Sequence, residues 1–313
     1  MQKVIVIAGP TAVGKTAVAL TLARHLQCEI ISTDSVQVYR GLDIGAAKPT
    51  MAERAHVPHH LLDIRDPRDN YTVADFQKDA AAAIADIHSR GKIPMLVGGT
   101  GLYLRAVIRG FAFSDSGIDP QIRNRLQKLA QTQGAEALHQ KLSQVDPQTA
   151  NKLHPNDLRR VIRALEVIEQ NQQPISEQLQ QTPAQPVYDA YQFALTLQRA
   201  TLYQRIEARV DKMMAAGLLR EVQQLLLRGV PPEAKAMQSL GYKQLVAHLQ
   251  GELPLADAVA LIKRDTRRFA KRQLTWFRHE QNLTWLEMDQ VSPTEAAEII
   301  SSYLAGFFQL GEN

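Results

Sequence analysis

Apolar positions in the first hundred residues form short continuous runs that alternate with helical stripes. Runs at residues 4–8, 28–32 and 91–97 have the length of buried strands. Between them, apolar residues recur at helical spacing over residues 17–26, and residues 77–90 form an alanine-rich helical segment. Strands that alternate with helices predict a parallel sheet whose ligands collect at the carboxyl edge of its strands.

The pattern changes after Gly110. Residues 111–120 form a turn-rich linker, and residues 121 to about 182 then read as helical without a strand. Glutamine and proline are frequent in residues 170–186, as in a loose connector. Period-2 alternation returns at residues 191–197, which indicates that the chain rejoins the sheet. We therefore expect three segments: a core from 1 to 115, an all-helical insertion domain from 116 to 186, and completion of the core with basic helices from 187 to 313.

The octet at residues 9–16 lies between the first predicted strand and the first predicted helix. Its glycines allow backbone amides to turn inward around a phosphate chain, and the helix N-terminus adds partial positive charge. Lys15 contributes a point charge and Thr16 a hydroxyl suited to magnesium. The fold class that follows is an α/β, P-loop NTPase-like parallel sheet flanked by helices. The expected phosphate-binding residues are Gly9, Pro10, Thr11, Ala12, Val13, Gly14, Lys15 and Thr16.

The octet does not identify which phosphate compound binds in the loop. An NTPase usually ends a strand with a Walker-B aspartate, but the strand at residues 91–97 runs into Gly98 and Gly99. Asp63 could replace that carboxylate only through space. Steady ATP hydrolysis is therefore disfavoured, and small-molecule kinases and other transferases remain.

Asp34 ends the second predicted strand at the same edge of the sheet as Lys15 and Thr100. A carboxylate beside a phosphate site is repelled by phosphate, so we interpret Asp34 as a base that accepts a proton from an attacking N–H or O–H group. The alternative is a structural cap on the following turn. His59 and His60 lack a third metal ligand at suitable spacing, and we interpret them as structural.

Composition narrows the class of protein. The 313 residues are 45% hydrophobic and 22% charged, as in a globular chain. No apolar run approaches the roughly twenty residues that span a bilayer, and no signal peptide precedes the first strand. The single cysteine, Cys28, excludes an internal disulfide and a CxxC-type metal site. We expect a cytoplasmic protein.

The net charge is only +4, but the positive residues are clustered in particular segments. Residues 263–278 contain seven lysines and arginines against the single acid Asp265, interleaved with aromatic residues. Arg159, Arg160 and Arg163 lie outside the apolar stripe of an earlier helix. Basic helices are often only solvated faces, but two such surfaces suggest a nucleic-acid clamp, with aromatics that stack on bases of a single-stranded RNA loop.

A further cation is predicted near the phosphate site. Thr201-Leu-Tyr-Gln204 has the pattern of a capping box, which places Arg205 in the first turn of a helix just past a strand end. That position suits a second cation on the phosphate. The alternative is a solvated helix arginine.

Seven motifs in this order resemble one known family over nearly the full chain. They occupy residues 9–16, 34–41, 58–63, 97–103, 163–167, 240–242 and 271–276. The chain resembles the bacterial tRNA dimethylallyltransferases, also called tRNA isopentenyltransferases. The resemblance implies transfer of a dimethylallyl group from its diphosphate to N6 of the adenosine 3′-adjacent to the anticodon. It also implies a P-loop that holds pyrophosphate rather than ATP, which explains the missing Walker-B carboxylate.

The resemblance also implies a role for individual residues. Asp34 would take the proton from the adenine amino group, and Thr100 would bond the oxygen that leaves. Lys15, Thr16 and Arg205 would hold the diphosphate with Mg²⁺. The expected tRNA-binding residues are Asp34, Ser35, Val36, Gln37, Thr100, Arg123, Arg159, Arg160, Val161, Ile162, Arg163, Lys271, Arg272, Gln273, Leu274, Thr275, Trp276, Phe277 and Arg278.

Two departures from the family are visible. Ala46 stands where the family usually has threonine or serine, and the zinc-binding tail of eukaryotic relatives is absent. The expected partners are the anticodon stem-loop of tRNA and dimethylallyl diphosphate, with no membrane and no obligate protein partner, so a monomer.

Two other classes of protein stay open. A P-loop small-molecule kinase would place ATP in the loop and use Asp34 on an acceptor hydroxyl. A non-catalytic RNA-binding protein would keep the P-loop as a relic, although Lys15, Thr16, Asp34 and Thr100 are all intact. Magnesium-ATP turnover indifferent to RNA would identify the kinase.

Overall fold

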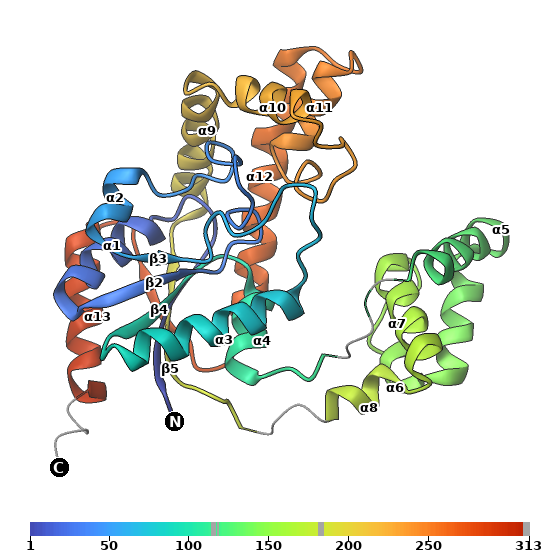
Figure 1. The fold of residues 1–313 in the computed structure, drawn as a ribbon, viewed down its shortest axis with the longest axis horizontal. Coiled ribbons are helices and arrows are strands. Elements are labelled where there is room, and N and C mark those ends of the chain that lie inside the picture. Colours follow the sequence, from blue (N-terminus) through green and yellow to red (C-terminus); the bar gives the residue numbers. More distant parts are fainter. Residues whose placement is uncertain (114–116, 118, 181–184, 309–313) are drawn as a thin grey trace. The chain divides into compact units, whose positions relative to one another are not determined.

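The computed structural model describes residues 1–113, 117, 119–180 and 185–308. The chain divides into two compact units: Met1–Ile108 with Tyr188–Asn313, and Arg109–Val187. The first unit is the α/β core, and the second consists of helices (Figure 1).

The core is built on one six-stranded sheet in which all neighbouring strands are parallel. Its order is β3-β2-β4-β1-β5-β6. The strands are β1 Lys3–Ala8, β2 Cys28–Ser32, β3 His59–His60, β4 Ile93–Gly98, β5 Asp189–Thr196 and β6 Thr284–Glu287. This confirms the predicted fold class. The sequence analysis missed β3 and β6, which are too short to show a periodic pattern.

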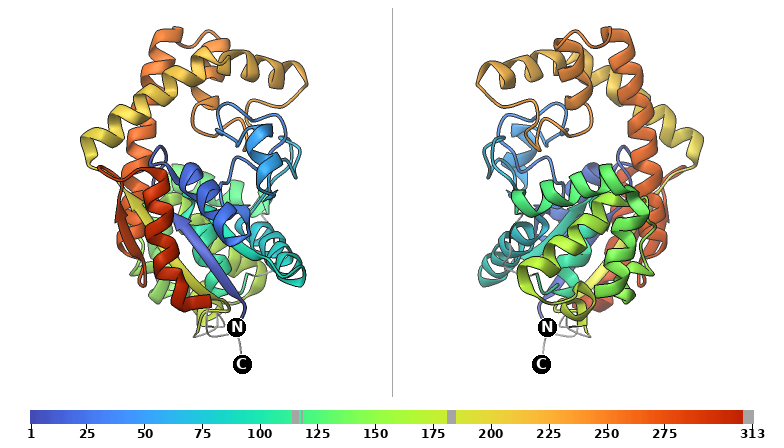
Figure 2. Two further views of the ribbon diagram at one scale, coloured as in Figure 1. Left: turned by 90° about the vertical axis from the view of Figure 1, so that its left-hand side faces the viewer. Right: turned by 90° about the vertical axis from the view of Figure 1, so that its right-hand side faces the viewer.

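Helices cover both faces of the sheet (Figure 2). The helices of the core unit are α1 Lys15–Leu26, α2 Met51–His56, α3 Val73–Ser89, α4 Gly101–Arg109, α9 Arg199–Ala215, α10 Leu218–Leu227, α11 Tyr242–Leu249, α12 Leu255–Arg278 and α13 Pro293–Phe308. Of these, α10 and α11 lie away from the sheet (Figure 1). Because successive side chains of a strand point to opposite faces, alternate residues of β1 enter different cores. Ile5 and Ile7 pack with α1 and α13, whereas Val4 and Val6 pack with α3 and α4.

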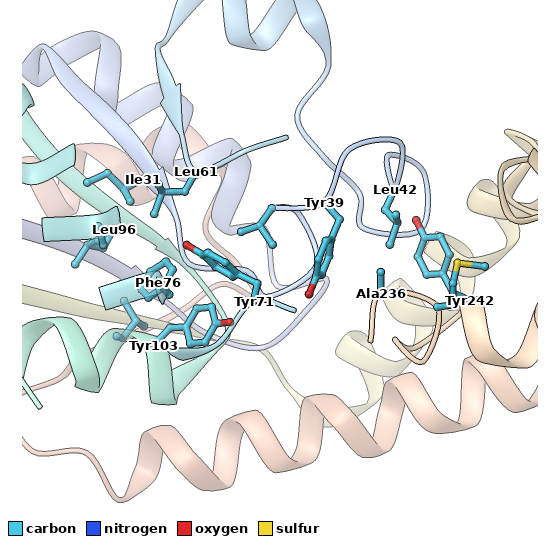
Figure 3. Packing of buried hydrophobic residues seen from close by; sticks show 14 of the residues in the cluster. Ile31, Tyr39, Leu42, Leu61, Tyr71, Phe76, Leu96, Tyr103, Ala236 and Tyr242 are labelled. Atoms are coloured by element: carbon cyan, nitrogen blue, oxygen red, sulfur yellow. The ribbon is translucent and has the colours of Figure 1, made fainter. Parts of the chain in front are cut away.

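One of these cores extends from the sheet into the layer formed by α10 and α11. Phe76 of α3 stacks on Tyr103 of α4 with ring centroids 4.2 Å apart. In Figure 3, Tyr39 and Leu42, from the segment after β2, lie on the path from these rings to Tyr242. A continuous apolar cluster therefore supports the segment that follows β2.

The start of α9 differs from the prediction. This helix begins at Arg199, with Gln198 as its N-cap residue and no side-chain cap. The predicted capping box at Thr201 is therefore wrong, because Thr201 already lies within the first turn. Arg205 consequently lies in the second turn of the helix rather than the first.

The second unit contains α5 Pro120–Val145, α6 Pro147–Ala150, α7 Leu158–Asn171 and α8 Ile175–Gln180. No strand occurs in its described residues, as the pattern predicted. Gly134, with φ of 88°, interrupts α5. In the described part of the whole chain, no helix is long and apolar enough to cross a membrane.

Candidate active site

The loop between β1 and α1 has the backbone of a phosphate-binding loop. Gly9 has φ of 142°, and a Cβ there would lie 2.6 Å from the carbonyl oxygen of Leu195 in β5. Gly14, with φ of 109°, is the N-cap residue of α1. Both positions require glycine, and the helix N-terminus therefore opens directly onto the loop.

Lys15 folds back onto this loop. Its Nζ donates to the carbonyl oxygens of Gly9 at 3.0 Å and Pro10 at 2.7 Å. Burial and, to a smaller extent, the charge of Arg209 lower the pKa of Lys15 from 10.5 to about 7, and the charge of Asp34 opposes the shift. A diphosphate in the loop would compete for the ammonium and favour its charged form.

A cavity of about 420 Å³ opens beside the loop, and we call it the phosphate pocket. The predicted residues that line it are Thr11, Ala12, Gly14, Lys15, Thr16, Asp34, Gln37, Arg205 and Gln273. Gly99 also lines the cavity, whereas its neighbour Thr100 is not among the lining residues. The carboxyl ends of β1, β2 and β4 therefore do converge on one crevice.

Asp34 has both a structural bond and a spare oxygen. Its Oδ1 accepts hydrogen bonds from the backbone nitrogens of Val36 at 2.8 Å and Gln37 at 3.3 Å. Its Oδ2 has no hydrogen-bond partner among the described residues. The turn-capping interpretation is thus correct for Oδ1, whereas Oδ2 accepts no such hydrogen bond from the part of the chain described.

Gln37 is held rigidly next to Asp34. Its Oε1 accepts from the Ser32 hydroxyl at 2.7 Å, and its Nε2 donates to the carbonyl oxygens of Ala46 at 3.1 Å and Ala47 at 3.3 Å. The departure from the family at Ala46 therefore leaves a backbone contact to Gln37 in place.

The loop that carries Ala46 is itself anchored by one carboxylate. Glu221 of α10 accepts hydrogen bonds from the backbone nitrogens of Asp43, Ile44 and Gly45 at 2.9, 2.8 and 3.2 Å. The Tyr242 hydroxyl also donates to it, at 2.6 Å. Two helices distant in sequence therefore set the loop that holds Gln37.

Two arginines of α9 face the phosphate loop. Arg205 is exposed and donates to the carbonyl oxygen of Val13 at 3.5 Å. Arg209, one turn later, is half-buried. Burial lowers the pKa of Arg209 and the charge of Asp34 opposes the shift. The sequence analysis missed Arg209; its spacing of four residues from Arg205 was the signal that could have found it.

Asp63 does not act as a replacement Walker-B residue. It forms ion pairs with Lys48 and with Arg54, the latter at 2.7 Å. Burial raises the pKa of Asp63, but the bonds from these two cations outweigh it and lower the pKa below its usual value. Asp63 lines a neighbouring cavity rather than the phosphate pocket.

The two histidines of β3 make local contacts. His60 Nε2 lies 2.7 Å from a Glu29 carboxylate oxygen, and His59 Nδ1 lies 2.7 Å from the carbonyl oxygen of Val57. These contacts agree with the structural interpretation. No group of three or more histidine, cysteine or acidic residues able to hold a metal occurs in the part of the chain that the structure describes.

The basic helix α12 presents two different faces. Lys271, Arg272, Thr275 and Arg278 are exposed. On the other face, two residues that were also predicted to bind tRNA point inward: Phe277 is buried in the core that contains α3 and α4, and Leu274 packs against the core that contains α1 and α13. Gln273 is also buried.

Trp276 is likewise engaged inside the protein. The Arg105 guanidinium lies 4.4 Å from the centroid of its ring, and Arg105 is paired with Glu280. A Cβ on Gly101 would collide with the indole. Trp276 therefore packs on the turn that carries Thr100 instead of offering a face to a base.

In the helical unit, the predicted arginines fall into two groups. Arg159 and Arg160 are exposed. Arg123 and Arg163 bond the carboxylate of Glu166 at 2.7 and 2.9 Å, and Glu166 is 0% exposed. Burial raises the pKa of Glu166, but the bonds from Arg163 and Arg123 outweigh it and lower the pKa.

Val161 and Ile162 belong to the core of this unit rather than to its surface. Both are buried with Leu126, Leu138 and Leu165. Both were predicted to bind tRNA; their side chains belong to the apolar stripe of α7 and are buried.

Comparisons with known proteins agree over the whole chain. The IPP transferase family model matches residues 37–280. The tRNA dimethylallyltransferase 1 of Trichlorobacter lovleyi is 53% identical over 307 residues, 98% of this chain and 99% of its own. The tRNA dimethylallyltransferase of Bacillus subtilis is 44% identical over 310 residues, 99% and 98% of the two chains.

Solved structures give the same picture. The tRNA isopentenylpyrophosphate transferase of Bacillus halodurans is 45% identical, with a TM-score of 0.73 and coverage of 98% of this chain and 96% of that one. A eukaryotic dimethylallyltransferase acting on tRNA is 30% identical, with a TM-score of 0.81 and coverage of 99% and 80%.

Proposed function

Because the chain belongs to the IPP transferase family, we infer that it is a tRNA dimethylallyltransferase. It transfers a dimethylallyl group from dimethylallyl diphosphate to N6 of the adenosine 3′-adjacent to the anticodon and releases diphosphate. The observation that carries this assignment is the phosphate pocket, where Lys15 and two arginines lie beside an aspartate with one unbonded oxygen. β4 ends at Gly98 without a Walker-B carboxylate, which favours a diphosphate donor over ATP hydrolysis.

The phosphate loop and α9 bind the diphosphate in this proposal. The α1 N-terminus, Lys15, Arg205 and Arg209 supply positive charge where the leaving group gains negative charge. These cations act more strongly as the leaving oxygen separates than in the ground state, so they lower the barrier as well as binding the substrate.

Thr16 is the residue that would hold Mg²⁺. Thr16 lines the pocket at the start of α1, and Mg²⁺ commonly uses one or two protein oxygens together with phosphate oxygens and water. The residues present fit that arrangement. When bound, the ion supplies further neutralisation of the leaving diphosphate.

Asp34 is the general base and Thr100 assists the leaving group. As N6 of adenine bonds to C1 of the dimethylallyl group and the C1–O bond breaks, the N6 proton passes to Oδ2 of Asp34. Thr100, between β4 and α4, donates a hydrogen bond to the departing oxygen. Ser35, Val36 and Gln37 hold the base after it leaves its stack.

Exposed cations on two helices bind the RNA backbone. These are Lys271, Arg272 and Arg278 on α12, and Arg159 and Arg160 on α7. The helical unit grips the anticodon stem-loop in this proposal. In this proposal the enzyme acts as a cytoplasmic monomer without an obligate protein partner.

The test is transfer to an unmodified anticodon stem-loop in the presence of Mg²⁺ and dimethylallyl diphosphate, read by mass spectrometry of the RNA. A C5H8 gain on the target adenosine is expected. Asp34→Asn is the matched variant, because its amide oxygen still accepts the turn hydrogen bonds of Oδ1. We expect it to lose about 10²- to 10⁴-fold in turnover with RNA affinity almost unchanged. Normal turnover would remove Asp34 from the mechanism, and ATP turnover without RNA would identify a kinase.

A further inference from the structure

One buried side chain of α12 joins the two loops that form the phosphate pocket. Gln273 Oε1 accepts a hydrogen bond from the backbone nitrogen of Thr11 at 2.9 Å. Its Nε2 donates to the carbonyl oxygen of Gly99, also at 2.9 Å. Gln273 is only 7% exposed, so both ends of the amide are committed to the protein.

The position of the Gln273 amide restricts residue 99 to glycine. A Cβ on Gly99 would collide with Nε2 of Gln273, which explains why glycine precedes Thr100. The backbone N–H of Thr11, in the phosphate loop, donates to Gln273. The amide therefore sets the distance between the phosphate loop and the Thr100 turn, and the diphosphate lies between these two groups in the proposed reaction.

The same helix carries the exposed cations proposed to bind RNA. Lys271 and Arg272 directly precede Gln273, but their side chains are exposed while that of Gln273 is buried. Three residues after Gln273, Trp276 packs on Gly101 of the Thr100 turn. One rigid helix thus touches both substrate-binding loops with its inner face and presents RNA-binding charge on its outer face.

We propose that Gln273 is a positioning residue that couples RNA binding on α12 to the phosphate loop. This inference rests on the proposed function. RNA bound to the outer face restrains α12, and Gln273 then holds Thr11 and Gly99 at the spacing that the diphosphate needs. Because coupling between two binding sites is reciprocal, RNA tightens diphosphate binding and diphosphate tightens RNA binding by the same factor.

A second buried glutamine provides a matched control. Gln244 of α11 accepts from the backbone nitrogen of Gly241 at 2.9 Å and donates to Asp265 at 3.0 Å. It is 4% exposed and does not line the phosphate pocket. Gln273→Met and Gln244→Met therefore each remove two hydrogen bonds of a buried amide, but only Gln273→Met disconnects the pocket loops.

The experiment measures the Kd of inorganic diphosphate with Mg²⁺ by calorimetry, with and without saturating unmodified anticodon stem-loop. No prenyl donor is present, so nothing reacts. In the unaltered protein, RNA is expected to tighten diphosphate binding by about fivefold or more, the lower end of typical coupling. Gln273→Met should bring that ratio close to one, because lost coupling means equal affinity with and without RNA, and Gln244→Met should retain the original ratio.

Gly99→Ala supplies a second route to the same contact, because it leaves α12 intact and displaces the Gln273 amide. It should reduce the ratio as Gln273→Met does. An unaltered ratio in either variant, or equal loss in Gln244→Met, would overturn the inference. Failure of the unaltered protein to prenylate the RNA would instead overturn the proposed function, and that outcome is read separately by mass spectrometry.

Discussion

The lowered pKa of Lys15 predicts that diphosphate binding weakens steeply above neutral pH. The ammonium is buried against the Gly9 and Pro10 carbonyls, near Arg209. Burial, followed by the Arg209 charge, lowers its pKa from 10.5 to about 7 in the free protein. Below pH 7 the site is already charged, whereas above it a proton must be taken up before the anion is held.

The size of the effect follows from that pKa. At pH 8 roughly one free molecule in ten carries the charged lysine, and at pH 9 roughly one in a hundred. Because the bound anion raises the pKa of Lys15 again, the association constant should fall by roughly tenfold for each pH unit above 7, with uptake of about one proton per diphosphate.

Isothermal calorimetry with inorganic diphosphate and Mg²⁺ between pH 6.5 and 9 tests this, in two buffers of different ionisation enthalpy to count protons. Lys15→Arg is the control, because its guanidinium remains protonated throughout and its slope reports only the titration of the ligand and other groups. The unaltered protein should show the steeper decline. Equal slopes and equal proton uptake in the two proteins would refute the assignment to Lys15.

Three further predictions concern residues around the site. Tyr242→Phe removes the hydroxyl that donates to Glu221 and should lower the free energy of unfolding by about 1–2 kcal/mol in urea titration; no change would exclude a stabilising role for that bond. Glu166→Gln leaves two partly exposed arginines without their buried carboxylate and should destabilise the helical unit by about 1–3 kcal/mol, seen as an earlier transition in circular dichroism. Since the Glu166 pKa is lowered, its stabilisation is present above its unfolded pKa and is lost as the pH falls through the folded value, so the difference between variant and unaltered protein should vanish in acid. Replacing Lys271 and Arg272 by glutamine should flatten the salt dependence of RNA affinity by about 0.7 in log–log slope per lost phosphate contact, and an unchanged slope would place the RNA elsewhere.

The sequence by itself determined four of the six strands, the phosphate loop and the helical insertion, since these depend on local periodicity and local backbone geometry. The runs at residues 4–8 and 28–32 became β1 and β2, and the octet became a loop whose glycines have positive φ. Lys15 and Asp34 could be selected because strand ends of a parallel sheet meet at one edge. The seven motifs also indicated the family that the comparisons show.

Only the tertiary structure decided which polar side chains face the site and which are used inside the protein. The partners of Gln273 lie 262 and 174 residues away in sequence, and the pairing of Asp63 with Lys48 removes it from the phosphate pocket. Arg209 lines that pocket one turn of α9 after Arg205, and its half-buried position became visible only in the folded chain. A count of charges along a helix reports how much positive charge it carries, but burial and hydrogen bonding depend on the elements packed against each face, and those contacts form only when the chain folds.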